Sequence, residues 1–169
     1  MVFILGLKPL FFWLCSNKLR QPKKRGKKMS TNANIGIIAK QNSSTIVWIR
    51  CHWDGYPASV GKILTEKYTE PSKVWQLIAL GDISSLGENL EPTTDSHSFE
   101  HPEENTTIAY HRDRHEDWSP ALRPAVDTNL DRFLDVEYAY LFDQDKCKWT
   151  CYNCLYTLSD QEFEEAIES

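Results

Sequence analysis

The chain of 169 residues has no apolar run long enough to cross a membrane as a helix, which takes about 20 residues. Its most apolar stretch, 2–14, is interrupted by Lys8 and Pro9. The basic residues near this stretch follow it, which is the reverse of a secretory signal, and no small-residue cleavage site comes after it. Without a secretion signal, the 5 cysteines are expected to be free thiols in a reducing cytosol.

Glycine is scarce, at 7 residues, and the glycines do not form a phosphate-binding loop, because no Lys-Ser or Lys-Thr pair follows a glycine run. The triplet His111-Arg112-Asp113 matches the catalytic loop of protein kinases, but the glycine-rich loop, the strand lysine and the downstream asparagine are missing. The nucleophile elbow of the serine hydrolases is missing too. No signature therefore fixes a reaction. We leave open whether the protein is an enzyme, and we expect no cofactor.

Excess positive charge is also missing, since 19 Lys and Arg residues stand against 24 Asp and Glu residues, a net charge of −5. Residues 1–28 hold 8 basic residues and no acidic one, so residues 29–169 carry −13. Such an acidic domain repels nucleic acid and membrane surfaces, and we expect it to bind neither directly. It could instead occupy a basic groove on a partner, or imitate the phosphates of DNA. Plain solubility is the other explanation of this charge.

Composition divides the chain at residue 29. Residues 1–28 are expected to be a basic and apolar extension outside the domain, either because the start codon is placed too early or because they act as a weak membrane anchor. We favour the first explanation, in which Met29 begins the working protein. Residues 29–169 suit a single domain with one core, because domains cluster near roughly 100–150 residues.

Hydrophobic periodicity predicts an α+β domain, with a mainly antiparallel sheet of about five strands and short helices packed on one face. Strands are expected at 35–40, 45–51, 106–111, 137–142 and 148–155. The first two and the last two are expected to form hairpins. Helices are expected at 60–68, 71–80, 128–134 and 160–168. The last helix opens with a capping box, Ser159-Asp-Gln-Glu162. Residues 82–87 are expected to form a turn, 89–105 a mobile surface loop and 116–126 irregular chain.

The run Arg50-Cys-His-Trp-Asp-Gly-Tyr-Pro57 lies where the second strand turns into the first helix, a position that often carries function. Strand alternation places Arg50, His52 and Asp54 on one face. His52 is a candidate general base near neutral pH, with Asp54 as the carboxylate that orients it. Arg50 and Tyr56 are candidate ligand-binding residues. The alternative is structural, with Asp54 accepting turn amides or capping the next helix while His52 bonds a backbone carbonyl.

A second polar cluster, 110–117, follows the expected third strand. Its His111 and Asp113 are further candidate acid–base residues. Arg112 and Arg114 could hold a phosphate group, since a guanidinium binds phosphate oxygens in pairs. The same mixed charges could instead form an ion-pair network at the end of the strand. We expect the two clusters to lie together around one cleft.

Cys147, Cys151 and Cys154 have the Cys-x3-Cys-x2-Cys spacing of radical S-adenosylmethionine enzymes, whose three thiolates bind an iron–sulfur cluster. Those enzymes need a large barrel after the motif, and only 15 residues follow Cys154. Alternation along a strand would also place Cys147 and Cys151 on one face and Cys154 on the other. We therefore predict no metal and treat the three cysteines as weak candidate ligands. A zinc site would need a fourth ligand, such as Cys51 or a histidine.

Several motifs occur in order along the chain: Ser30-Thr31, Ile35-Gly36, Cys51-His-Trp-Asp-Gly-Tyr-Pro57, Val60-Gly61, Leu77-Ile-Ala-Leu-Gly-Asp-Ile-Ser-Ser-Leu-Gly-Glu88 and Tyr110-His-Arg-Asp-Arg114. In these motifs the chain resembles, from about Met29 to Phe142, a family of small uncharacterised proteins of tailed bacteriophages. The resemblance implies a phage setting, the cytoplasm of the bacterial host, and a start near Met29, but it implies no activity. The chain departs from the family pattern at His115, where glycine is more common, and in its cysteine-bearing last hairpin.

Three functions stay open at this point. The first, which we predict, is an accessory protein that binds a host or defence protein. The second is a binder or hydrolase of a nucleotide or another phosphorylated ligand, with Arg112 and Arg114 on the phosphate and His52 or His111 as acid–base. The third is a DNA mimic that inhibits its partner. A concave pocket that joins the two clusters would favour the phosphorylated-ligand function. A continuous acidic ridge would favour DNA mimicry, and a flat apolar patch would favour binding of a host or defence protein.

Overall fold

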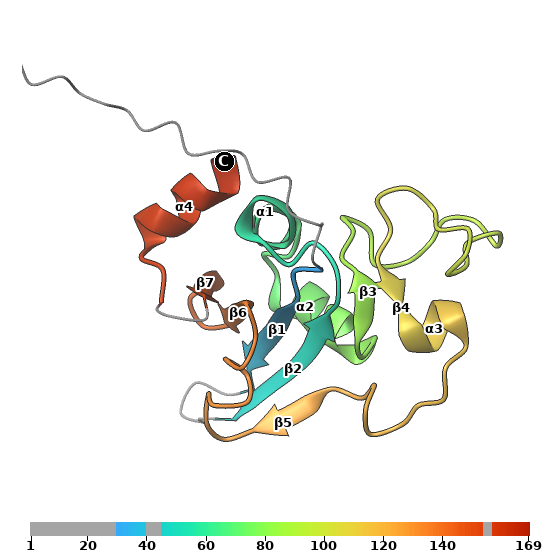
Figure 1. The fold of residues 1–169 in the computed structure, drawn as a ribbon, viewed down its shortest axis with the longest axis horizontal. Coiled ribbons are helices and arrows are strands. Elements are labelled where there is room, and N and C mark those ends of the chain that lie inside the picture. The colour runs from blue at the N-terminus through green and yellow to red at the C-terminus, as the bar shows by residue number, and fades with distance from the viewer. Residues whose placement is uncertain (1–29, 40–44, 154–156) are drawn as a thin grey trace, which may run out of the picture.

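The computed structural model describes residues 30–39, 45–153 and 157–169 (Figure 1). Three expected features, namely the extension at 1–28, the turn at 41–44 and Cys154, lie outside the described residues. The elements are, in chain order, β1 (Ala33–Ile38), β2 (Ile46–Cys51), η1 (Pro57–Gly61, a π-helical turn), α1 (Lys62–Lys67), α2 (Pro71–Ala79), β3 (Ile83–Ser85), β4 (Ile108–Ala109), α3 (Tyr110–Arg114), β5 (Ala125–Asp127), β6 (Tyr138–Asp143), β7 (Lys148–Asn153) and α4 (Asp160–Glu168). Within these ranges no helix combines the length and the apolar character needed to span a bilayer.

The strands form one mixed sheet of seven strands in the order β4-β3-β2-β1-β6-β7, with β5 paired to β2. Most pairs are antiparallel, and β1–β6 and β2–β3 are the parallel ones in the described chain. The predicted α+β fold with a mainly antiparallel sheet is therefore confirmed, with seven strands in place of about five. The parallel pairing of β1 with β6 joins the two expected hairpins, β1–β2 and β6–β7, into one sheet.

Two strands occupy segments for which no strand was expected. Residues 82–87 contain β3, where Ile83 lies opposite Cys51 and Ala109. The segment 116–126, expected to be irregular, runs into β5, which pairs with the first half of β2. Strands of three residues are too short to carry an alternating pattern. They are strands because they form ladder hydrogen bonds with segments that are distant in sequence.

Two other predictions were wrong in extent or type. The strand expected at 106–111 is limited to β4, because the chain coils into α3 at Tyr110. The helix expected at 128–134 is a series of turns, in which the Asn129 side chain accepts the Asp131 amide and Phe133 is fully buried. A local side-chain to backbone bond of this kind competes with helix formation.

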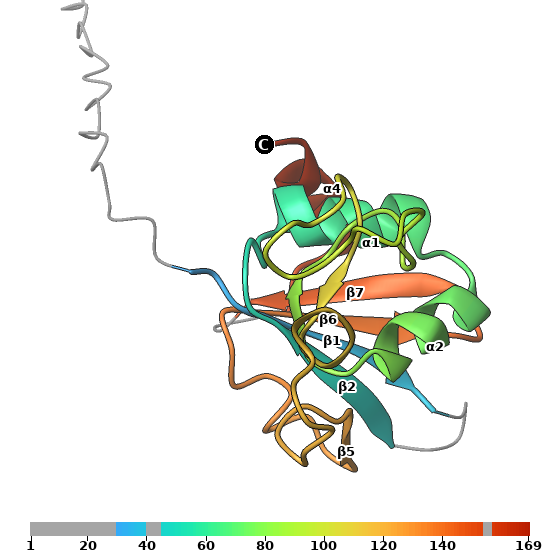
Figure 2. The ribbon, with the colours of Figure 1, turned by 90° about the vertical axis from the view of Figure 1, so that its right-hand side faces the viewer.

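Helices α1, α2 and α4 cover one face of the sheet, as expected (Figure 2). Leu64, Leu77 and Phe163, one from each helix, join the main core with the inward side chains of the strands. The Phe163 ring lies 5.9 Å from that of Tyr140 in β6, which anchors α4 to the sheet.

The predicted capping box at the start of α4 is confirmed. The Ser159 hydroxyl accepts the Glu162 amide, and the Glu162 carboxylate accepts the Ser159 amide at 2.8 Å. The Ser159 amide and hydroxyl, which both donate to the Glu162 carboxylate, hold the pKa of Glu162 below its ordinary value.

On the opposite face of the sheet, the described residues form a second core cluster over part of the width. Phe133 packs edge-on against Trp48 with ring centroids 6.1 Å apart, and Leu141 belongs to the same second core cluster. The Trp48 indole also donates to Asp127 in β5 at 2.8 Å. The segment 125–136 thus covers β1, β6 and the first half of β2. The end of β2, together with β3 and β4, carries the candidate site.

Candidate functional site

The candidate site begins where β2 leaves the covered part of the sheet. Ile49 and Cys51 point into the core, whereas Arg50 and His52 are exposed on the opposite face. Tyr110, the first residue of α3, approaches this face from β4, and its hydroxyl is hydrogen-bonded to Ser84 of β3. Partial burial raises the pKa of Tyr110 above its ordinary value.

A continuous line of ring contacts runs from the β2 corner to α3. The His52 ring lies 5.8 Å from Trp53 and 6.3 Å, edge-on, from Tyr110. Tyr110 stacks on Phe99 at 5.8 Å, and the Arg114 guanidinium lies 4.9 Å above Phe99. We call these five residues the aromatic row. Trp53 is 47% exposed, so the row ends in a large apolar side chain in contact with solvent.

The aromatic row joins the two polar clusters that the sequence singled out, since His52 belongs to the first and Tyr110 to the second. The two clusters are therefore neighbours, and the residue of the second cluster that meets His52 is Tyr110. Phe99 comes from the segment 89–105, where its amide donates to the Asp113 carbonyl at 3.0 Å. Arg114 also pairs with Glu116 at 3.0 Å.

Asp82 lies at the base of this site and fills a gap in the sheet. β5 pairs with β2 as far as Trp48, and β3 pairs with it at Cys51, so the Arg50 amide lies between the two. The Asp82 carboxylate accepts that amide at 2.9 Å. Burial raises the pKa of Asp82 to about 6, although the Arg50 amide and charge and the nearby His52 oppose the shift.

We expect Asp82→Asn to remove a pH dependence of stability. The carboxyl pKa is about 6 in the folded protein against an ordinary 3.8, so folding favours its protonated form, and stability falls as pH rises through this range. The amide keeps an acceptor for Arg50 and does not ionise. The free energy of unfolding of the native chain should drop relative to Asp82→Asn by about 1 kcal/mol between pH 4 and 7, less than the full shift implies because the group is partly solvated. Urea titrations across this range measure the difference, and two parallel curves would contradict it.

Arg112 and Asp113, both predicted site residues, are used inside the fold. The buried Asp113 carboxylate accepts the Ala109 amide at 2.7 Å and the Arg112 Nε at 2.6 Å. Arg112 also donates to the carbonyls of Leu90 and Thr107 at 2.6 and 2.5 Å. Burial opposes ionisation of Asp113, but Arg112 and the amide outweigh it, so the pKa of Asp113 lies below its ordinary value. This arrangement is the ion-pair network offered as the alternative for this cluster.

His97 completes the network around Asp113. Its Nδ1 accepts the Glu103 amide at 3.0 Å, so a neutral ring carries its proton on Nε2. That Nε2 lies 3.3 Å from the Asp113 carboxylate, with both side chains nearly inaccessible to solvent. The segment 89–105, expected to be a mobile loop, is thereby attached to α3 at Leu90 and His97.

His111 lies apart from this network. Its ring packs on Trp118 with centroids 4.7 Å apart, and its Nδ1 is 2.7 Å from the Glu116 carbonyl. His111, Arg112 and Trp118 line a hollow of about 480 Å³ together with Ala79 and Leu80 from the end of α2. His115 adopts a left-handed conformation with φ of 57° that ends α3.

The corner after β2 is held by the backbone conformation of Asp54 and by hydrogen bonds of the Gly55 backbone. Asp54 has φ of 55°, a left-handed conformation that aspartate tolerates better than most residues, and it turns the chain toward η1. The Gly55 amide donates to Thr31 at 2.8 Å, and its carbonyl accepts the buried Tyr140 hydroxyl at 2.8 Å. Tyr56 follows and is 41% exposed.

The cysteines do not share the environment expected from strand alternation. Cys147 lies in the turn before β7 with φ of 50° and is exposed, whereas Cys151 is buried in β7. Alternation does not extend to a residue outside the strand, so the expected common face of these two cysteines is wrong. Burial raises the pKa of Cys51 and Cys151 to about 12, which keeps both as neutral thiols. In the ranges that the structure describes, no group of three or more His, Cys, Asp and Glu side chains could hold a metal ion.

Three residues of this region, Asp82, Phe99 and Trp118, were not predicted from the sequence. Asp82 stands in the Leu-Gly-Asp-Ile segment of the phage-family resemblance, which was its one available signal. Phe99 and Trp118 are isolated aromatics in polar chain. Aromatic residues in such segments need a burial partner or a ligand, and this was the signal that could have identified them.

Comparison of the chain with protein-family models, with curated proteins and with solved structures gave no match. The bacteriophage resemblance therefore stays a prediction from the motifs. The function has to be argued from the site itself.

Proposed function

We propose that this is a small accessory protein that binds another protein through the aromatic row. The observation that carries the proposal is the unbroken series of ring contacts from Trp53 to Arg114, ending in a half-exposed tryptophan. Tryptophan, tyrosine and arginine are the residues most enriched at the energetic centres of protein interfaces. In the phage setting predicted from the motifs, the partner is a host or defence protein in the bacterial cytoplasm.

The arrangement of the arginines favours this function over a phosphate site. Arg112 donates to Asp113, Leu90 and Thr107, so its guanidinium has no free edge for a phosphate. Arg114 is held between the Phe99 ring and the Glu116 carboxylate. A phosphate ligand would have to displace these internal partners, whereas a protein partner can pack against the rings as they stand.

The distribution of acidic residues also favours protein binding through the row over DNA mimicry. Several exposed or partly exposed carboxylates form ion pairs with neighbouring bases, namely those of Glu88, Glu91, Glu116, Asp127, Asp143 and Asp160. A carboxylate beside a basic side chain presents little net charge to a partner. The paired residues would therefore interrupt a phosphate-like ridge.

Trp53→Ser is expected to abolish capture of the partner. The full chain, immobilised, is exposed to a lysate of the bacterial host, and retained proteins are identified by mass spectrometry. Loss of a tryptophan that anchors a protein interface typically costs about 2 kcal/mol or more, so retention should fall by roughly 30-fold. Val126→Ser is the matched control, because Val126 is 62% exposed but lies on β5 outside the row.

Equal retention by the native chain and Trp53→Ser would refute binding through the row. Equal losses in both variants would indicate general hydrophobic adsorption. A nucleotide that raises the melting temperature of the native chain but not of Arg114→Ala would favour the phosphorylated-ligand alternative instead.

A further inference from the structure

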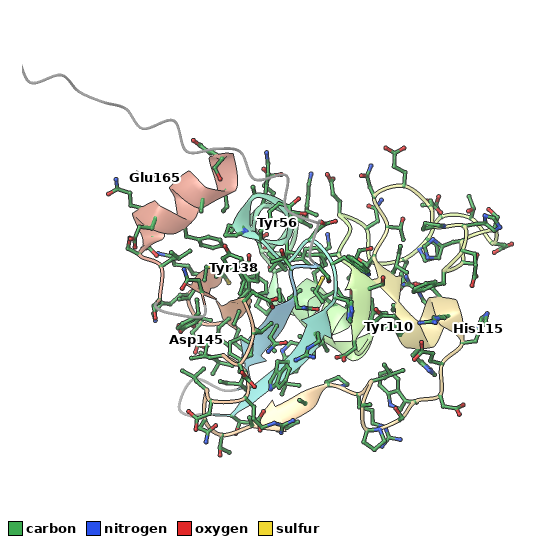
Figure 3. The ribbon with its side chains drawn as sticks, viewed as in Figure 1. Tyr56, Tyr110, His115, Tyr138, Asp145 and Glu165 are labelled. Atoms are coloured by element: carbon green, nitrogen blue, oxygen red, sulfur yellow. The ribbon has the colours of Figure 1, made fainter. Side chains whose placement is uncertain are left out.

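A second surface is hollowed into a groove of about 490 Å³ between α4, the start of η1 and the β6–β7 edge of the sheet. Its walls include Tyr56, Tyr138, Leu158, Glu162 and Glu165. In Figure 3 Tyr56, Tyr138 and Glu165 lie on the side of α4, and Tyr110 of the aromatic row lies on the side of α3. The groove is therefore a surface separate from the row.

The charged residues of the groove are carboxylates. Glu162 and Glu165 line it, and among the residues that the structure describes no lysine or arginine does. Glu165 accepts a hydrogen bond from the neutral Gln161 amide at 2.9 Å, and Glu162 accepts from Ser159. Among the ion pairs of the described residues neither glutamate takes part. Within the described residues the groove thus presents two negative charges that no basic side chain pairs.

The aromatic residues of the groove favour the same kind of ligand as the carboxylates, namely a cation. Tyr56 is 41% exposed beside the groove, although it is a large side chain that could have been buried. Ammonium and guanidinium groups bind the faces of aromatic rings and carboxylates at the same time. Tyrosine and glutamate side chains around one hollow therefore select a cationic group.

The spacing of the two glutamates indicates an extended peptide. Residues three apart on a helix have Cβ atoms about 5–6 Å apart, which applies to Glu162 and Glu165 on α4. Alternate residues of an extended chain are about 6.5 Å apart and point to the same side. Two basic side chains at alternate positions can therefore reach both carboxylates, while a single small cation would leave most of the groove empty.

We propose that the groove formed by Tyr56, Tyr138, Glu162 and Glu165 binds a basic segment of a partner protein, in extended conformation with Lys or Arg at alternate positions. This site does not depend on the aromatic row, and either one can fail without the other. It gives the acidic domain a defined contact for a basic partner.

The test uses the full chain and a fluorescein-labelled peptide with alternating arginine and alanine, followed by fluorescence anisotropy at low salt. Glu165→Gln and, separately, Tyr56→Ser are expected to weaken binding about five- to tenfold. Glu164→Gln is the matched control, because it removes the same charge from α4 but lines a different hollow, and it should change binding less than twofold. A peptide with glutamine in place of arginine should not bind. All three substituted residues lie outside the buried core, and circular dichroism checks that each variant folds.

Three results would overturn the proposal. The first is no saturable binding of the arginine peptide. The second is an equal loss in Glu164→Gln and Glu165→Gln, which would mean attraction to the overall charge of α4. The third is a loss in Trp53→Ser with none in Glu165→Gln, which would move the peptide to the aromatic row.

Discussion

Asp113→Ala is expected to lower the free energy of unfolding by about 3 kcal/mol and to release the segment 89–105 from α3. The substitution leaves the half-buried Arg112 guanidinium without its buried carboxylate partner, with only the exposed Glu91 remaining, and the Ala109 amide without its acceptor. His97 loses the acidic group that its Nε2 faces. A buried polar group left without its partner costs more than the bond itself contributes, because it is not rehydrated.

Urea denaturation measures the stability of Asp113→Ala, and hydrogen exchange measures the release of the segment. The amides of Phe99 and Thr107 should exchange faster, because their acceptors lie on α3 and on the tethered segment itself. Asp117→Ala is the control, since Asp117 is an exposed carboxylate four residues away, and it should change stability by less than about 0.5 kcal/mol. A loss below 1 kcal/mol with unchanged exchange would show that the network does not hold this segment.

Gly55→Ala is expected to lower the free energy of unfolding by about 2–3 kcal/mol and to disturb both proposed binding surfaces. A Cβ at this position would lie 2.7 Å from the Asn32 carbonyl carbon and 2.8 Å from Ala33. These are mostly backbone atoms of the chain entering β1, so rotation of a side chain cannot relieve the contact. The corner would have to move away, weakening the hydrogen bonds from Gly55 to Thr31 and from Tyr140 to Gly55.

Gly55→Ala should affect both proposed binding surfaces, which distinguishes it from a substitution within one of them. Trp53 lies two residues before Gly55 and Tyr56 follows it, so Gly55→Ala should weaken partner capture and peptide binding together, whereas Trp53→Ser and Tyr56→Ser each affect one. Ser59→Ala, a change of similar size in the same corner, should leave stability within about 0.5 kcal/mol. Native-like stability of Gly55→Ala would mean that the approach of residues 32 and 33 is looser than the structure has it.

Most long elements could be predicted from the sequence because their signals are local. The alternating residues of β2, the Pro71 start of α2 and the capping box at Ser159 each lie within a few residues of the element they define. Elements that depend on distant partners could not be predicted in this way. β3 and β5 are too short to show a pattern, and the turns at 128–134, found in place of a helix, bring Phe133 against the distant Trp48.

The candidate site also has features that local sequence signals predict and features that depend on distant contacts. The sequence indicated that His52 and the cluster 110–117 would be neighbours, and the contact between His52 and Tyr110 agrees. It could not indicate which members of the cluster would be used internally. Arg112 bonds to Leu90, which is 22 residues away, and this choice follows from the path of the segment 89–105.

The α+β class, the acidic charge, the corner at Arg50–Pro57 and the helix that Ser159 caps can be read from the chain alone, because composition, alternation and caps act over short distances along it. Three contacts follow from the folded arrangement: Asp82 bonds the Arg50 amide, Phe99 stacks on Tyr110, and Tyr56 and Glu165 line one groove. These pairs come from segments far apart in sequence. Their contacts are set by how the strands order themselves in the sheet, and that order depends on the whole core at once.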